Sequence, residues 1–165
     1  RDSSTSRGLG DVYKRQVEQR LDNLAQRVIE SDNIIFTGVG SSGLICDYAA
    51  RRLAGVGINT FSFSDVTYPI ASKLQNTTNT LVIALSISGE TNEIIEVLTS
   101  LRSNKDVYIS SITPKINSSI AELSDFVLTY RINEHRINTH YDLTSQLPTV
   151  YLTERLTDLV YQRSH

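Results

Sequence analysis

Residues 80–91 read TLVIALSISGET, and this stretch decides the fold. Residues 80–85 are almost all apolar, which is typical of a central strand in a parallel sheet that is buried on both faces. Four of the six residues at 86–91 are small or hydroxyl-bearing, and apolar residues at helical spacing follow them at Ile94, Val97, Leu98 and Leu101. The stretch therefore predicts a strand, a loop and a helix in that order.

The same order occurs earlier in the chain, where residues 33–43 read NIIFTGVGSSG. A short apolar strand over 33–37 leads into a glycine-rich loop at 38–43, and an apolar helical pattern runs on to Leu53. The hydrophobic pattern elsewhere predicts further strands at 58–63, 107–112 and 126–130, and helices at 17–31, 65–75, 118–123 and 144–161. This alternation predicts an α/β fold, a three-layer sandwich around a doubly wound, mostly parallel sheet.

The length and composition suit one globular domain. The chain has 165 residues, of which 39% are hydrophobic and 21% charged, and a formal net charge of −2. No apolar run approaches the roughly 18 residues that a membrane span needs, so we expect no membrane association. The single cysteine, Cys46, excludes an internal disulfide and indicates a cytoplasmic protein. Without a block of basic residues, the chain is not expected to bind nucleic acid by itself.

The first sixteen residues differ from the rest. They are rich in Ser, Gly and Arg, carry no sustained apolar period, and end in residues 10–16, which resemble translated sequencing-adaptor sequence. The chain also contains no methionine. We therefore expect residues 1–16 to be a non-native or disordered leader, residues 17–165 to form the domain, and an upstream part of the intact protein to be missing.

Two loops carry the residues that could bind a ligand. We call residues 38–43 the glycine loop and residues 86–91 the serine loop; each follows a strand and precedes a helix, where parallel sheets place ligands. Helix starts offer free N–H groups and a positive dipole end, and glycines let the backbone approach a ligand. No lysine lies in either loop, which favours a monophosphate over a nucleoside triphosphate with magnesium. The predicted anion-binding residues are Gly40, Ser41, Ser42, Ser86, Ser88, Gly89 and Thr91.

Other interpretations of these loops remain open. Serines and glycines at such turns are also common as helix caps and tight turns. The glycines at 38, 40 and 43 match the dinucleotide-binding fingerprint, with Asp65 near the position of the ribose-binding acid. The serines inside the pattern and the presence of a second hydroxyl-rich loop favour a phosphate cradle instead.

The two loops, in this order of strands and helices, resemble the SIS (sugar isomerase) domain from about Val17 to Tyr161. The resemblance implies that Ser42, Ser86, Ser88 and Thr91 contact a sugar phosphate, with Ser41 and Gly89 beside it. Ile87 stands where aminotransferring members often have glutamine. Residues 142–148 look most like the effector-binding domain of RpiR-family transcription regulators. Such regulators carry a helix-turn-helix DNA-binding domain before this domain, which implies DNA contact only through a missing part.

Two functions follow from the resemblance. The first is a sensor domain that binds a phosphorylated sugar or amino sugar and is not itself an enzyme. The second is an aldose–ketose sugar-phosphate isomerase, which needs a base with a pKa near 7. Glu134 and His135 are the main candidates for that base, with His140 and Glu154 as further ones. Many isomerases with one SIS domain have a catalytic glutamate near the start of the last helix, where this chain has Ser145 and Gln146.

We expect no metal and no cofactor, because His135 and His140 lack a clear third ligand. The last expected helix, 144–161, has apolar residues on more than one side. One side can cover the sheet and another a second subunit, so we expect a homodimer or a higher homo-oligomer.

Overall fold

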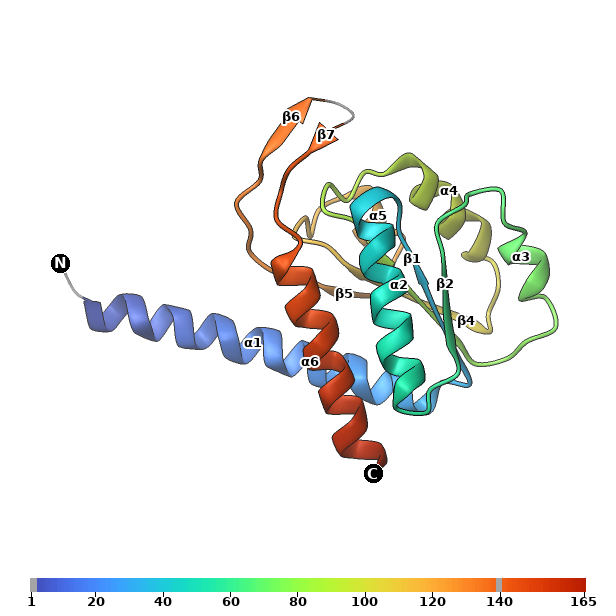
Figure 1. Ribbon diagram of the computed structural model, residues 1–165, viewed down its shortest axis with the longest axis horizontal. Helices are drawn as coiled ribbons and strands as arrows, with labels where there is room; N and C mark the ends of the chain where they lie inside the picture. The colour runs from blue at the N-terminus through green and yellow to red at the C-terminus, as the bar shows by residue number, and fades with distance from the viewer. Residues whose placement is uncertain (1–2, 139–140) are drawn as a thin grey trace.

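The computed structural model describes residues 3–138 and 141–165 (Figure 1). Its order of elements alternates strands and helices up to β5 and then adds a small hairpin before the last helix. The elements are α1 (Ser3–Glu30), β1 (Asn33–Thr37), α2 (Gly40–Gly55), β2 (Thr60–Phe63), α3 (Ile70–Lys73), β3 (Thr80–Leu85), α4 (Asn92–Leu101), β4 (Val107–Ile112), α5 (Ser119–Glu122), β5 (Phe126–Leu128), β6 (Arg136–Asn138), β7 (Tyr141–Asp142) and α6 (Leu147–Ser164).

The main sheet has five strands in the order β2-β1-β3-β4-β5, and every neighbouring pair is parallel. β1 lies between β2 and β3, so the chain moves outward from β1 in one direction and from β3 in the other. Doubly wound sheets bind ligands in the crevice beyond the carboxyl ends of the two strands from which the chain moves in opposite directions, here β1 and β3. Ile35 pairs in register with Val82, which places the ends of β1 and β3 side by side.

Helices cover both faces of the sheet, so the predicted three-layer sandwich is confirmed. Side chains alternate along each strand: Ile34 and Phe36 of β1 pack on one face, while Ile35 packs on the other. The first face is covered by α1, α2 and α6, and the second by α3, α4 and α5. β3 is buried along its whole length, as its apolar sequence predicts.

The first helix is longer than the pattern over 17–31 predicts, because it extends back to Ser3 and projects beyond the sheet (Figure 1). Tyr13 anchors this extension, since its hydroxyl accepts a hydrogen bond of 2.7 Å from the backbone N–H of Arg131. The Arg131 guanidinium also lies over the Tyr13 ring, 4.3 Å from its centre. Residues 3–16 are therefore helical here, and the idea that residues 1–16 are a leader foreign to the protein stays a prediction.

Two predicted helices have other bounds in the structure. The expected helix over 65–75 is reduced to α3, because Asp65 forms a tight turn with Thr67 and Pro69 disfavours helix in the residue before it. The last helix begins at Leu147 rather than at residue 144, with Pro148 in its first turn.

The hairpin of β6 and β7 was not predicted, since strands of two and three residues give almost no hydrophobic period. It stands at the carboxyl edge of the sheet, above the start of α6 (Figure 1). Within the described residues, no helix combines the length and the hydropathy that crossing a membrane requires.

Candidate functional site

A cavity of about 460 Å³ lies at the carboxyl ends of β1 and β3. The glycine loop, the serine loop and the segment from the hairpin to α6 each form one wall. The first two walls consist of Val39, Gly40, Ser41, Ser42, Ile87, Ser88 and Thr91. The third wall consists of Arg136, Asp142, Leu143, Thr144 and Gln146.

The glycine loop turns directly into the first turn of α2. Gly40 has φ 58°, a left-handed conformation that side chains disfavour. A Cβ on Gly43 would lie 2.9 Å from the carbonyl oxygen of Gly38, so the loop can pack this tightly only with glycine there. No side chain caps the start of α2, which leaves the first N–H groups and the positive end of the helix dipole at the cavity.

The serine loop is held together by its own hydroxyls. Ser86 is only 3% exposed, and its Oγ accepts a hydrogen bond from the Gly89 N–H at 3.0 Å and shares one with Thr91 Oγ1 at 2.9 Å. Ser88 Oγ accepts from the Glu90 N–H at 3.0 Å and lies 3.5 Å from Thr91 Oγ1. Ser88 and Thr91 therefore present hydroxyls to the cavity, while Ser86 supports them from below.

The short helix α5 braces the serine loop from behind. The Gly89 carbonyl accepts from the Ile120 N–H at 3.0 Å, and the Glu90 carboxylate accepts from the N–H and hydroxyl of Ser119 at 2.9 and 2.6 Å. These two hydrogen bonds lower the pKa of Glu90. The carboxylate is thus turned toward α5, and Glu90 is not among the residues that line the cavity.

The third wall brings a positive charge that the sequence did not predict at the site. Arg136 of β6 lines the cavity and donates from Nη2 to Asp142 Oδ2 of β7 at 3.1 Å. Burial raises the pKa of Asp142, but hydrogen bonds from Thr144 and the charge of Arg136 outweigh it, so this pKa lies below its ordinary value. No sequence signal points to this pair, because only the fold of the hairpin brings the two residues together.

The Gln146 side chain closes the space between the third wall and the glycine loop. Its Nε2 donates to Ser42 Oγ at 3.3 Å, which joins the residue before α6 to the first turn of α2. Its Oε1 is buried and makes no hydrogen bond with the described residues.

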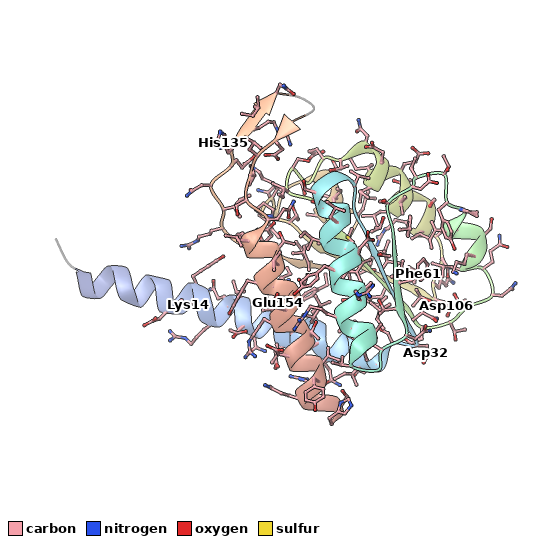
Figure 2. All side chains as sticks on the ribbon, viewed as in Figure 1. Lys14, Asp32, Phe61, Asp106, His135 and Glu154 are labelled. Atoms are coloured by element: carbon pink, nitrogen blue, oxygen red, sulfur yellow. The ribbon has the colours of Figure 1, made fainter. Side chains whose placement is uncertain are left out.

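Three of the candidate bases, Glu134, His135 and Glu154, are not among the residues that line the cavity. Glu134 pairs with Lys115, and Glu154 accepts a hydrogen bond of 2.6 Å from the Tyr48 hydroxyl. Figure 2 shows Glu154 midway along α6 and His135 beside the hairpin. The backbone of His135 bonds Thr144 Oγ1 and Leu143 N at 2.7 Å each, and His135 is exposed. His140 lies outside the described residues.

Among the described residues, neither the candidate ribose-binding acid nor a cluster of possible metal ligands lines the cavity. Asp65 does not line it and instead accepts hydrogen bonds from the hydroxyl and N–H of Thr67, which lower its pKa. In the part of the chain that the structure describes, no three His, Cys, Asp or Glu side chains cluster as metal ligands. Cys46 is buried, and this burial raises the pKa of its thiol.

The structure thus brings five of the seven predicted site residues to one cavity, namely Gly40, Ser41, Ser42, Ser88 and Thr91. Ser86 and Gly89 lie behind them and shape the loop. Hydroxyl and N–H donors dominate the first two walls. Such an arrangement can hold an anion, and it offers no side chain with a pKa near 7 among the described lining residues.

Comparison with known proteins agrees with this geometry. The model of the SIS domain matches residues 28–153, which is most of the chain. The chain belongs to the SIS domain family. The predicted family is therefore confirmed, and the match covers both loops that line the cavity.

Relatives of the chain include regulators and enzymes. It is 26% identical over 130 residues to an uncharacterized HTH-type transcriptional regulator of Clostridium perfringens, covering 78% of this chain and 46% of that protein. It is 28% identical over 110 residues to the 3-hexulose-6-phosphate isomerase of Bacillus subtilis, covering 67% of this chain and 56% of that protein. The chain spans 30% to 46% of the length of the first three curated relatives that it matches.

Two solved regulators share the fold. The sugar isomerase domain of an RpiR transcription factor from Sphaerobacter thermophilus aligns with a TM-score of 0.74 at 17% identity, covering 99% of this chain and 92% of that one. The NanR protein of Vibrio vulnificus, complexed with ManNAc-6P, aligns with a TM-score of 0.73 at 21% identity, covering 94% of this chain and 63% of that one.

Proposed function

We propose that this chain is the effector-binding domain of a helix-turn-helix transcription regulator of carbohydrate metabolism, and that it senses a phosphorylated sugar or amino sugar. One observation carries the proposal: the glycine and serine loops, 48 residues apart between Gly40 and Ser88, meet around one cavity lined by hydroxyls. The likeness to an HTH-type regulator and to NanR, whose structure contains ManNAc-6P, supports the same function.

The phosphate is held by the hydroxyls of Ser41, Ser42, Ser88 and Thr91 and by the first N–H groups of α2. The start of α4 lies directly after Thr91 and adds a second helix dipole. Arg136 supplies a positive charge from the third wall. Hydrogen bonds to a charged group contribute about 1.5–3 kcal/mol each, so four or five of them support micromolar affinity after the costs of ordering.

The third wall transmits ligand binding to α6 and the helices packed against it. A sugar phosphate that touches both loops and the hairpin restrains the segment leading into α6, which packs against α1 and α2. In the intact regulator, a DNA-binding domain precedes residue 17, and α1 connects the two parts. A coupling of about 1–3 kcal/mol between ligand and DNA binding is typical of such proteins. We further propose a cytoplasmic homodimer or higher homo-oligomer, since the chain has one unpaired cysteine and several exposed apolar side chains on α2 and α6.

Calorimetry with ManNAc-6P and glucose 6-phosphate tests the proposal. The wild-type chain should bind at least one of them, and Ser88→Ala should lower its affinity roughly tenfold or more, because a hydrogen bond to phosphate is lost. Ser103→Ala is the matched control, since Ser103 is exposed and lies outside the cavity wall. Equal affinities for wild type and Ser88→Ala would show that the phosphate lies elsewhere.

A second candidate is a sugar-phosphate isomerase, which the likeness to 3-hexulose-6-phosphate isomerases of Bacillus subtilis and Methanocaldococcus jannaschii favours. Asp142 is the carboxylate in the cavity wall, and its lowered pKa makes it a weak base. A coupled assay with hexose and pentose phosphates decides between the two functions. Turnover that is lost in Asp142→Asn, Glu134→Gln or His135→Asn would favour the enzyme.

A further inference from the structure

The hydrogen bond between Gln146 and Ser42 determines where the Ser42 hydroxyl proton points. Gln146 donates from Nε2 to Ser42 Oγ at 3.3 Å, and an amide N–H is only a donor. Ser42 Oγ is therefore the acceptor in this contact, so its own proton is directed away from Gln146. Because Ser42 lines the cavity, that proton is available to an anion bound there.

The other end of the Gln146 amide has an unused acceptor. Oε1 is buried and makes no hydrogen bond with the described residues, although Gln146 lines the cavity. A buried acceptor without a partner is unfavourable, and a donor on a bound molecule would remove that cost. Sugar phosphates carry such donors as hydroxyls, and amino-sugar phosphates also carry them as N–H groups.

We propose that Gln146 positions the Ser42 hydroxyl to donate to the ligand phosphate, while its Oε1 accepts a hydrogen bond from a hydroxyl or N–H of the sugar. The inference rests on the proposed function and adds a specificity determinant to it. The Gln146 amide then contacts the sugar through Oε1 and acts on the phosphate through Ser42. Gln146 is the residue directly before α6.

A glutamate at this position would reverse the arrangement. Its carboxylate accepts only, so the Ser42 proton would turn toward it and away from the phosphate. We expect Gln146→Glu to weaken the binding of inorganic phosphate and of ManNAc-6P at least tenfold, because one hydrogen bond to a charged group is lost and the new carboxylate also repels the phosphate. Ser145→Asp is the matched control, because it places the same charge one residue away. Ser145 is exposed, and its Oγ accepts from the Leu147 N–H at 3.1 Å, which an Asp carboxylate also does.

The pH dependence separates an effect of the ionised carboxylate, through its charge and its hydrogen bonding, from simple disruption of the fold. Protonation turns the glutamate of Gln146→Glu into a donor again, so its deficit relative to wild type should shrink severalfold between about pH 7.5 and about pH 4.5, near the ordinary glutamate pKa of about 4.3. A purely structural defect would leave the ratio of the two affinities constant. Melting temperatures of the variants show that each remains folded under both conditions.

Gln146→Met tests the contact with the sugar, because its side chain has a similar length and neither donates nor accepts strongly. This variant should lose roughly threefold to tenfold in affinity for ManNAc-6P, the range for a neutral hydrogen bond, and much less for inorganic phosphate. Equal losses for both probes would overturn the sugar contact.

Wild-type binding accompanied by equal affinities of Gln146→Glu and Ser145→Asp would overturn the role of Gln146 and leave the proposed function standing. Failure of the wild-type chain to bind either probe would overturn both.

Discussion

Single residues set the shape of the serine loop, and Gly89 is the clearest example. Its φ of 69° belongs to the left-handed region, and an added Cβ would lie 2.3 Å from the Cβ and Oγ of Ser118. Ser118 cannot move away easily, since its Oγ accepts from the Ala121 N–H and caps α5. Gly89 therefore lets the loop lie against α5, which holds Ser88 and Thr91 at the cavity.

We expect Gly89→Ala to destabilise the domain by about 1–3 kcal/mol, because it combines overpacking with an unfavourable backbone conformation. It should also weaken phosphate binding, since relief of the clash displaces the loop. Urea unfolding measures the first effect and calorimetry the second. Gly55→Ala is the control: no atom lies within 4 Å of an added Cβ at the end of α2, and its stability should change little or rise. Similar losses in both variants would contradict the explanation.

Ser86 shows that residue type alone does not distinguish a ligand-binding hydroxyl from one that holds a loop together. Its hydroxyl was predicted to bind the ligand directly, and the same chemistry serves equally well to hold a loop together. Its burial and its hydrogen bonds to Gly89 and Thr91 favour the second role in this structure.

Among the elements, the hairpin of β6 and β7 contributes most to the site beyond the two loops. The Arg136–Asp142 ion pair and the hydrogen bond from Leu143 N to the His135 carbonyl join its two sides. Thr144 then connects it to the segment before α6, since its Oγ1 accepts from the His135 N–H. The third wall of the cavity thus depends on short-range contacts within residues 135–144.

We expect Arg136→Gln to raise the pKa of Asp142 toward its ordinary value, because the nearby positive charge is removed. The lowered pKa also determines how stability changes with pH. Since the folded pKa lies below the ordinary value of about 3.9, ionised Asp142 stabilises the hairpin above that pH, and the contribution is lost as the pH falls through the lowered folded pKa. This acid loss should be smaller in the variant.

Carbon NMR of the Asp142 carboxyl during an acid titration measures this pKa. Arg102→Gln is the matched control, because Arg102 pairs with Asp125 at 3.0 Å in a separate part of the fold. It should leave the Asp142 titration unchanged. An unaltered Asp142 pKa in Arg136→Gln would mean that the hydrogen bonds from Thr144 and the charge of His135 lower it without Arg136.

For the whole molecule, the relevant surface is the α2–α6 face, which we define by the exposed side chains of Leu44, Tyr48, Leu147 and Tyr151. α2 and α6 lie side by side (Figure 1), and the Tyr48 hydroxyl donates to Glu154 across them. The opposite side of α6 is buried through Leu152, Leu156 and Val160. Apolar residues thus lie on two sides of this helix, as the sequence predicted.

We expect the chain to sediment as a dimer at tens of micromolar, and Leu44→Lys to shift it to a monomer that keeps a native circular dichroism spectrum at about 25 °C, although loss of the dimer lowers its melting temperature. Leu44 is 68% exposed, so a lysine costs little in the monomer but much in a buried apolar interface. Ile116→Lys is the control, since Ile116 is 52% exposed and lies on the loop between β4 and α5. Sedimentation of the wild type as monomer alone would remove the dimer from the proposal.

The sequence by itself determined the strands of the main sheet, most of the helices and the two loops, because continuous apolar runs and glycines at strand ends leave the backbone few alternatives. It also led to the family, whose model matches residues 28–153. It did not determine the third wall. Arg136, Asp142 and Gln146 meet Ser42 and Thr91 only after the hairpin folds over the sheet edge, and no local pattern encodes such long-range contacts. The tertiary structure also decided which hydroxyls face the cavity, since burial and neighbouring donors, rather than residue type, direct a serine side chain.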